Sequence, residues 1–330
     1  MLAISLVFAT GCTTPPPESS GESIASMDVF IPTAEGVVLA GTLTRPVRVP
    51  GAAAVRVPVV VLVSGSGPQD RDGARDDLPG YRPFRDLAGA LAEHGVAVLR
   101  MDDRGTGASS GRFAGATTLD FASDLGATIA WLRARTDVDG ARIALLGHSE
   151  GALVALLAAS RDTAIAALVL LGAPSRTGRE LARWQRAALV ASDPSAFPAA
   201  SRATVLEGAE RAAERAARND VWLRTWFELD PRHIARDTHA PALLLHGEND
   251  RQVPVQQAGE LADALRARVV APGRAPATVL VQRFPHTDHL FLEDHDGDPR
   301  GYVRLAERSL RATVVSAIVE WLPPQLGVTR

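Results

Sequence analysis

Short apolar runs that alternate with amphipathic stretches are the feature that most constrains the fold of this chain. The run Val57–Val63 is almost all valine, which is typical of strands that are buried on both faces of a parallel sheet. A helical pattern follows over Phe84–His94, and a second apolar run follows over Val96–Met101. This strand–helix–strand order predicts βαβ units, and therefore an α/β fold with a mostly parallel central sheet.

The same alternation continues to the end of the sequence. We predict an opening hairpin formed by Val29–Ile31 and Val37–Thr44. Further strands are predicted over Arg142–Leu146, Ile165–Leu171, Ala242–His246 and Thr278–Phe284. Further helices are predicted over Leu119–Arg135, Gly151–Ala159 and Val303–Trp321. Residues 175–240 contain no strand pattern, so we expect a helical insertion of two or three helices. Its tryptophans Trp184, Trp222 and Trp226 either line a substrate pocket or pin the insertion onto the main domain.

The composition excludes several classes of function. A formal net charge of −3 gives no electrostatic reason to expect a nucleic-acid partner. All 35 Lys and Arg residues are arginine, so no mechanism can use a lysine nucleophile. The single cysteine, Cys12, excludes an internal disulfide and a metal site built from cysteines.

The amino-terminal segment has the pattern of a targeting signal. Leu2–Ala9 is apolar but too short to span a bilayer, Cys12 follows it, and a polar, proline-rich stretch comes next. This resembles the lipobox of bacterial lipoproteins, which implies a lipid on Cys12 and a place in the cell envelope, either anchored to a membrane or periplasmic or secreted. The alternative is a hydrophobic leader with an incidental cysteine.

The strongest chemical motif is Gly147-His148-Ser149-Glu150-Gly151, which matches G-x-S-x-G between a predicted strand and a predicted helix. The glycines permit a cramped turn that projects Ser149 above the sheet at the start of the helix. The structural alternative is a serine that acts only as a helix N-cap.

A nucleophilic serine needs a histidine to take its proton and a carboxylate to orient that histidine. In the strand–turn–helix context the chain order is serine, acid, histidine. The loop after Ala242–His246 offers Glu248 and Asp250, and the loop after Thr278–Phe284 offers His286, His289 and, further on, His295.

From about residue 28 to the end, the chain resembles the α/β-hydrolase superfamily. More narrowly, it is similar to bacterial serine esterases grouped with the serine aminopeptidase and dienelactone-hydrolase branch. The loop Gly247–Pro254 matches the G-x-x-D-x-x-V-P pattern of these enzymes, which assigns the acid to Asp250. The histidine of the family precedes a hydrophobic pair, which favours His289 over the other two.

The resemblance also implies an organisation and an oxyanion hole. It divides the chain into a signal segment at 1–12, a flexible tether at 13–27 and a hydrolase domain at 28–330, with helices on both faces of the sheet and a helical cap at 175–240. The run Gly65–Asp72 resembles the Gly-Ser-Gly-Pro-Gln-Asp-Arg-Asp loop of this branch, so the backbone N–H groups of Ser66 and Glu150 are the expected donors, with Gly67 as a substitute.

Three further features have simpler interpretations. His148 and Glu150 are expected to shape the serine turn, although Glu150 is also suited to meet a polar substrate group. Asp102–Ser109 matches D-x-R-G-x-G-x-S, and we interpret it as a turn pinned by Asp and Arg rather than a metal or acid/base site. Asp294–Asp298 lacks the glycine and glutamate of a calcium loop, so a solvated loop is expected.

Together these features predict a serine hydrolase that acts on a small-molecule ester, most simply a carboxylesterase for short- to medium-chain acyl groups. No metal or organic cofactor is implied. A serine aminopeptidase or amidase of the same fold is the alternative enzyme, and Glu150 or Asp70 could then hold the substrate amino group. A non-catalytic lipoprotein that binds a hydrophobic ligand through the insertion is the alternative outside enzymes.

Overall fold

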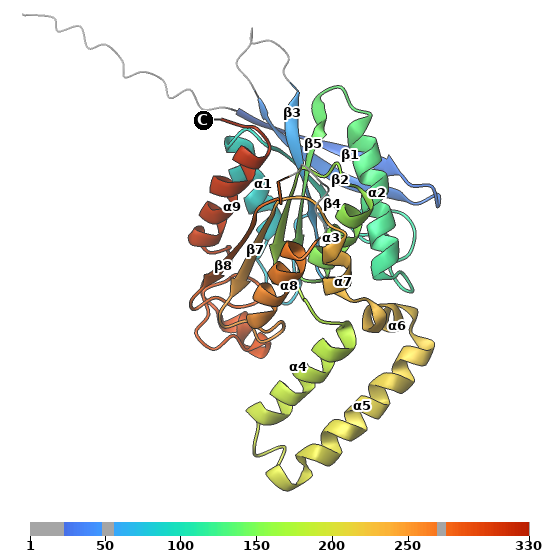
Figure 1. Ribbon diagram of the computed structural model, residues 1–330, viewed down its shortest axis with the longest axis vertical. Coiled ribbons are helices and arrows are strands. Elements are labelled where there is room, and N and C mark those ends of the chain that lie inside the picture. The colour runs from blue at the N-terminus through green and yellow to red at the C-terminus, as the bar shows by residue number, and fades with distance from the viewer. Residues whose placement is uncertain (1–22, 48–55, 269–274, 330) are drawn as a thin grey trace, which may run out of the picture.

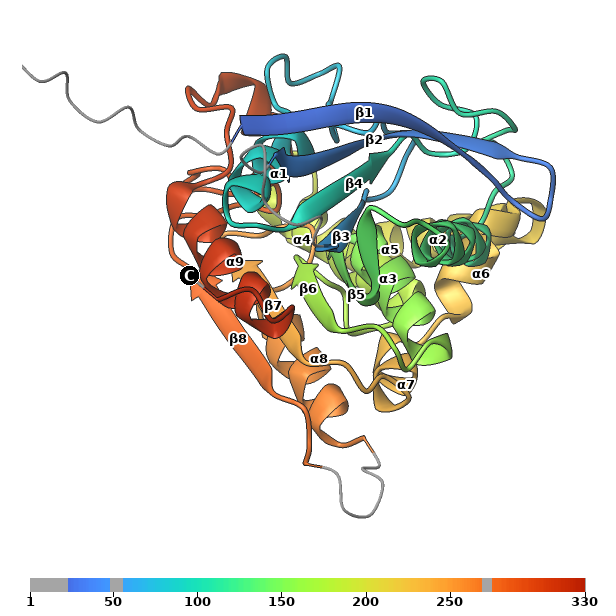
Figure 2. The same cartoon turned by 90° about the horizontal axis from the view of Figure 1, so that it is seen from above.

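One eight-stranded sheet forms the centre of the computed structural model, which describes residues 23–47, 56–268 and 275–329. The strands lie in the order β1-β2-β4-β3-β5-β6-β7-β8 (Figures 1 and 2). β1–β2 and β2–β4 are antiparallel pairs, and every later pair is parallel. The strands are β1 Ser23–Pro32, β2 Val38–Val47, β3 Val57–Val63, β4 Ala97–Met101, β5 Val138–His148, β6 Ala167–Leu171, β7 Ala242–Gly247 and β8 Val279–Phe284. The predicted α/β fold is confirmed.

Helices cover both faces of the sheet (Figure 2). In β3, Val59 and Val61 face one core with α2, α3 and α8, whereas Val60 and Leu62 face the other core with α1 and α9. Because successive strand residues point to opposite faces, a strand between two helical layers must be apolar throughout. These helices are α1 Pro83–Glu93, α2 Thr118–Arg133, α3 Glu150–Arg161, α8 Gln256–Arg266 and α9 Ala312–Gln325.

The predicted helical insertion lies between β6 and β7. α4 and α5 project from the domain beyond the carboxyl ends of the parallel strands, and α6 returns the chain to it (Figure 1). α7 instead packs on α3 and α8 and belongs to the main helical layer. The cap therefore consists of α4, α5 and α6, whereas α7, the last helix of the insertion, covers the sheet. Their bounds are α4 Gly178–Ser192, α5 Arg202–Asn219, α6 Val221–Glu228 and α7 Pro231–Arg236, with a short 3₁₀ turn at Ala199–Ser201.

Two boundaries and the exposure of one residue differ from the sequence predictions. β1 begins at Ser23, inside the expected tether 13–27, because it pairs with β2 from Ser23↔Val47 onward. The last helix begins at Ala312 rather than Val303, since Pro299–Arg304 forms a 3₁₀ turn and the Arg311 N–H bonds to the Phe291 carbonyl instead of to a preceding turn. Asp294 is buried rather than solvated.

The predicted amino-terminal signal segment falls outside the described residues, and so does Cys12. Within the described ranges, every helix is too short or too polar to cross a membrane.

Candidate active site

The strand–turn–helix junction holds Ser149 in a strained conformation. Its φ and ψ are 55° and −119°, in the left-handed half of backbone space that side-chain-bearing residues rarely adopt. The flanking glycines make the turn possible. A Cβ on Gly147 would lie 2.2 Å from the Gly151 carbonyl oxygen, and one on Gly151 would lie 2.2 Å from the Ser64 carbonyl oxygen. The strain supports a functional role, because the serine could make a helix N-cap without it, and its side chain makes no cap bond.

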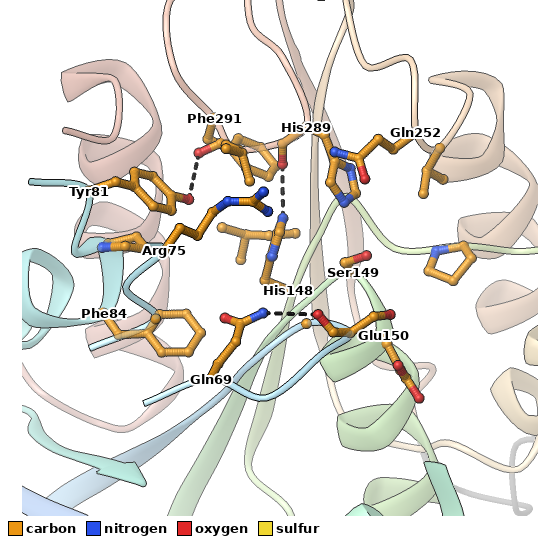
Figure 3. Close-up of a pocket in the computed structure, with 18 of the residues that line it drawn as sticks. Gln69, Arg75, Tyr81, Phe84, His148, Ser149, Glu150, Gln252, His289 and Phe291 are labelled. Carbon is orange, nitrogen blue, oxygen red and sulfur yellow. Dashed lines mark hydrogen bonds between the residues drawn. The ribbon is translucent and has the colours of Figure 1, made fainter. Parts of the chain in front are cut away.

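The loops after β7 and β8 bring Asp250 and His289 together. His289 Nδ1 lies 2.7 Å from Asp250 Oδ2, and the two side chains are buried. The other carboxylate oxygen accepts the N–H groups of Gln252 and Val253 at 2.8 Å each. Figure 3 shows the ring of His289 facing Ser149, and both residues line one cavity. With Nδ1 donating to Asp250, the free Nε2 is available to accept a proton from the serine.

A second histidine, His246, supports the same carboxylate. Its Nε2 lies 3.2 Å from Asp250 Oδ2 and 2.9 Å from the Val253 carbonyl oxygen. Burial acts to raise the pKa of Asp250, but the charge of His289 and the hydrogen bonds from His246 and His289 outweigh it, so the pKa lies well below its usual range. Asp250 is therefore ionised across the neutral range. The sequence alternatives lie elsewhere: Glu248 is exposed, and the exposed His286 and His295 contact each other.

His148 links the serine turn to the histidine loop. Its Nε2 lies 2.9 Å from the backbone carbonyl oxygen of His289, and the two rings are 4.8 Å apart. Burial, and then the nearby charge of His289, lower the pKa of His148 to about 3. At neutral pH the ring is uncharged and Nε2 carries the proton that the carbonyl accepts. His148 therefore positions the backbone of His289, a role that the sequence did not indicate.

The two predicted oxyanion donors lie beside the serine. Glu150 is the first residue of α3, where N–H groups have no partner within the helix. Ser66 lies on the loop after β3, which passes so close to the turn that a Cβ on Gly65 would lie 3.4 Å from the Ser149 Cβ. Ser66 lines the cavity, whereas Gly67, the predicted substitute, is not among the lining residues.

The Asp102–Ser109 turn braces this oxyanion loop. Asp103 accepts hydrogen bonds from the Ser64 hydroxyl at 2.8 Å and from the Gln69 N–H at 2.9 Å, on either side of Ser66. Asp102 accepts two side-chain bonds and one backbone bond from Arg71. Burial raises the pKa of Asp103 to about 7. The predicted pinning of this turn by Asp–Arg contacts is present in the structure.

The cap contacts the residue after the serine. Glu150 Oε1 accepts hydrogen bonds from the Thr118 hydroxyl at 2.6 Å and from Trp222 Nε1 at 2.9 Å. Trp222 stacks on Trp226 with ring centroids 5.6 Å apart, and both line the cavity. Trp184, the third predicted substrate-binding tryptophan, lies on α4 and is not among the lining residues.

The cavity has a volume of about 310 Å³ and opens over the serine (Figure 3). Its wall is both apolar and polar, and its apolar and aromatic residues come from the main domain and from the cap. These lining residues are Tyr81, Pro83, Phe84, Leu87, Leu171, Pro174, Leu181, Trp222, Trp226, Val253, Leu290, Phe291 and Leu310. No cluster of three potential metal ligands occurs within the described ranges.

Two family models match overlapping parts of the chain. The model described as serine aminopeptidase, S33, matches residues 81–231, and the prolyl oligopeptidase family model matches residues 209–306. Both matches lie within the α/β domain, and the first contains the complete G-x-S-x-G turn.

Similar proteins include an uncharacterized protein of Mycobacterium tuberculosis, which is 35% identical over 158 residues, 47% of this chain and 48% of that protein. Esterase EstD of Thermotoga maritima is 27% identical over 278 residues, 80% of this chain and 62% of that protein. The chain thus spans about half to three fifths of the length of these relatives. The solved structure of Est1E from Butyrivibrio proteoclasticus with bound ferulic acid superposes with a TM-score of 0.58 at 17% identity, covering 91% of this chain and 99% of that one.

The sheet order, the strained serine between β5 and α3, and the matching family models are all typical of the α/β-hydrolase fold. The chain has the α/β-hydrolase fold, and parts of it are similar to the serine aminopeptidase and prolyl oligopeptidase families.

Proposed function

We propose that this protein is a carboxylesterase that cleaves short- to medium-chain acyl esters through an acyl-enzyme on Ser149. The observation that carries the proposal is the buried His289–Asp250 pair beside a strained serine that lines a cavity. The esterases among the similar proteins support the same reaction class.

In the proposed mechanism, His289 Nε2 removes the hydroxyl proton of Ser149 as the oxygen attacks the ester carbonyl. The negative charge that develops on the carbonyl oxygen is stabilised by the N–H groups of Ser66 and Glu150. When the tetrahedral intermediate collapses, the imidazolium gives its proton to the departing alcohol oxygen. Water then attacks the acyl-enzyme with His289 again as base, which releases the acid and restores the serine.

The charged groups of the cavity favour this activity over that of an aminopeptidase. An aminopeptidase needs a carboxylate to hold the substrate ammonium group, and Glu150 is the only carboxylate among the described lining residues. Its Oε1 already accepts two hydrogen bonds, from Thr118 and Trp222. Asp70, the other candidate, does not line the cavity and instead accepts the N–H groups of Asp72 and Ala74.

The test compares hydrolysis of p-nitrophenyl butyrate with hydrolysis of amino-acid p-nitroanilides. We expect ester hydrolysis to dominate and to fall by at least about 10³-fold in Ser149→Ala. Ser123→Ala, which removes an exposed hydroxyl on α2, is the matched control and should leave the rate unchanged. Faster anilide hydrolysis would favour the peptidase. A folded protein that turns over neither substrate but binds an apolar ligand equally well with or without the Ser149 hydroxyl would favour the binding protein.

The envelope location also stays a proposal, based on the lipobox-like sequence that ends at Cys12. Mass spectrometry of protein extracted from membranes tests it. A lipid adduct on Cys12 is the expected result, and an unmodified Cys12 with the leader intact would contradict it.

A further inference from the structure

The cavity over Ser149 contains one permanently charged cation. Arg75 lies on the loop between β3 and α1, and it is the only arginine among the described residues that line this cavity. Figure 3 shows its guanidinium pointing into the space in front of His148, between Tyr81 and the catalytic side of the cavity. The mechanism proposed above does not use this group.

Arg75 is held in this orientation by Asp77. Its Nε donates to Asp77 Oδ1 at 2.9 Å, and its Nη2 donates to Oδ2 at 2.7 Å. Asp77 is exposed and does not line the cavity, so this pair fixes the outer edge of the guanidinium. The remaining nitrogen, Nη1, donates to no residue that the structure describes. A planar guanidinium fixed along one edge can still bind an anion along the other.

The surroundings do not compete for this group. The only carboxylate among the described lining residues, Glu150, is buried and bonded to Thr118 and Trp222. The charge of Arg75 also acts close to the nucleophile. It contributes to the lowered pKa of His148, although burial and the charge of His289 contribute more. An anionic group could therefore enter the cavity without meeting an uncompensated negative charge near Arg75.

We propose that Arg75 forms a subsite for a carboxylate on the substrate, so that the preferred ester carries an acidic group on its acyl or its alcohol portion. This inference rests on the proposed esterase function and makes its substrate class more specific. Arg75 acts on specificity: it binds the remote end of the substrate and takes no part in proton transfer.

Two matched substrate pairs test the subsite on either side of the ester. On the acyl side, mono-p-nitrophenyl glutarate is compared with its methyl ester. On the alcohol side, 4-acetoxybenzoate is compared with methyl 4-acetoxybenzoate. We expect the wild type to prefer the charged member in at least one pair. Arg75→Gln should lower kcat/KM for that member by about tenfold to a hundredfold, mainly through KM, because a charge-assisted hydrogen bond is lost.

The neutral member of each pair is an internal control for folding, since Arg75→Gln should change its kcat/KM less than about twofold. Arg85→Gln, which alters an exposed arginine on α1, is the matched variant and should preserve the preference. The inference is overturned if neither pair shows a preference for the charged ester, or if Arg75→Gln lowers both members equally.

A separate measurement keeps this inference distinct from the proposed function. If no ester is hydrolysed, the esterase proposal fails, and the subsite is then tested by the thermal shift that glutarate produces. A shift in the wild type that is lost in Arg75→Gln supports the subsite, and the same shift in both proteins contradicts it.

Discussion

Trp222 of cap helix α6 donates its indole N–H to Glu150, the residue directly after Ser149, over 2.9 Å. The backbone N–H of that same Glu150 is a proposed oxyanion donor. The cap is therefore bonded to the residue whose N–H is a proposed oxyanion donor, and we expect its position to affect the reaction as well as substrate access.

Trp222→Phe removes the indole N–H and keeps an aromatic ring that can stack on Trp226. Buried Glu150 would retain only the bond from Thr118. We expect kcat/KM for p-nitrophenyl butyrate to fall by about tenfold or more, because a hydrogen bond to a charged group is lost in a buried setting. Trp184→Phe, on α4 outside the cavity lining, is the control. Equal rates in wild type and Trp222→Phe would mean that this bond is structural only.

Asp250→Asn is expected to lower kcat by a factor on the order of 10³ to 10⁴. The amide keeps the shape of the carboxylate but does not fix the His289 tautomer with Nε2 unprotonated. Steady-state kinetics checks this prediction. Glu248→Gln, a change of an exposed residue in the same loop, should leave kcat unchanged. If the Glu248 variant loses activity instead, the acid has been misassigned.

Asp103→Asn tests the brace beneath the oxyanion loop. The carboxylate accepts from both Ser64 and Gln69, whereas an amide offers one oxygen and turns an NH₂ group toward the other donor. We expect kcat to fall about tenfold with KM nearly unchanged, since Ser66 lies between the two braced residues. Asp76→Asn, an exposed change, serves as the comparison. A rise in KM alone would assign this loop to substrate binding rather than to transition-state stabilisation.

The buried side chain of Asp288 should make the free energy of unfolding depend on pH. Burial raises its pKa to about 7, and its Oδ2 is buried with no partner among the described residues. The pKa of an aspartate in an unfolded chain is about 3.9. From about pH 4 to 7 the native state holds a proton that the unfolded state has released, so the free energy of unfolding decreases as pH rises through that window.

The asparagine side chain of Asp288→Asn does not titrate, so this variant lacks the loss of stability that Asp288 causes in the wild type as pH rises. The free energy of unfolding of the variant minus that of the wild type should therefore increase by roughly 2 to 4 kcal/mol between pH 4 and pH 7.5. Urea unfolding at several pH values measures the difference. Glu293→Gln, an exposed neighbour, should show no such trend. A difference that stays constant with pH would contradict the buried, protonated state of Asp288.

The sequence predicted the parts of the site that follow from local patterns. The G-x-S-x-G run located the serine turn, and strand periodicity placed the loops of Asp250 and His289 at the same edge of the sheet. Parallel strands bring their carboxyl ends together, so the order of motifs along the chain was enough.

The remaining contacts depend on packing between distant segments. His148 bonds to a carbonyl 141 residues away, and Trp222 bonds to Glu150 72 residues away. No local pattern specifies which loop such side chains reach. For the same reason the sequence left open whether Trp184 and Trp222 line a pocket or pin the insertion, and only Trp222 of these two lines the cavity.

The central claim is that Ser149 is a nucleophile activated by His289. The most direct measurement is labelling with a fluorophosphonate probe, followed by mapping of the adduct by mass spectrometry. We predict one adduct on Ser149 in the wild type and none in Ser149→Ala or His289→Ala. A folded wild type that stays unlabelled, or a Ser149→Ala variant that is still labelled, would contradict it.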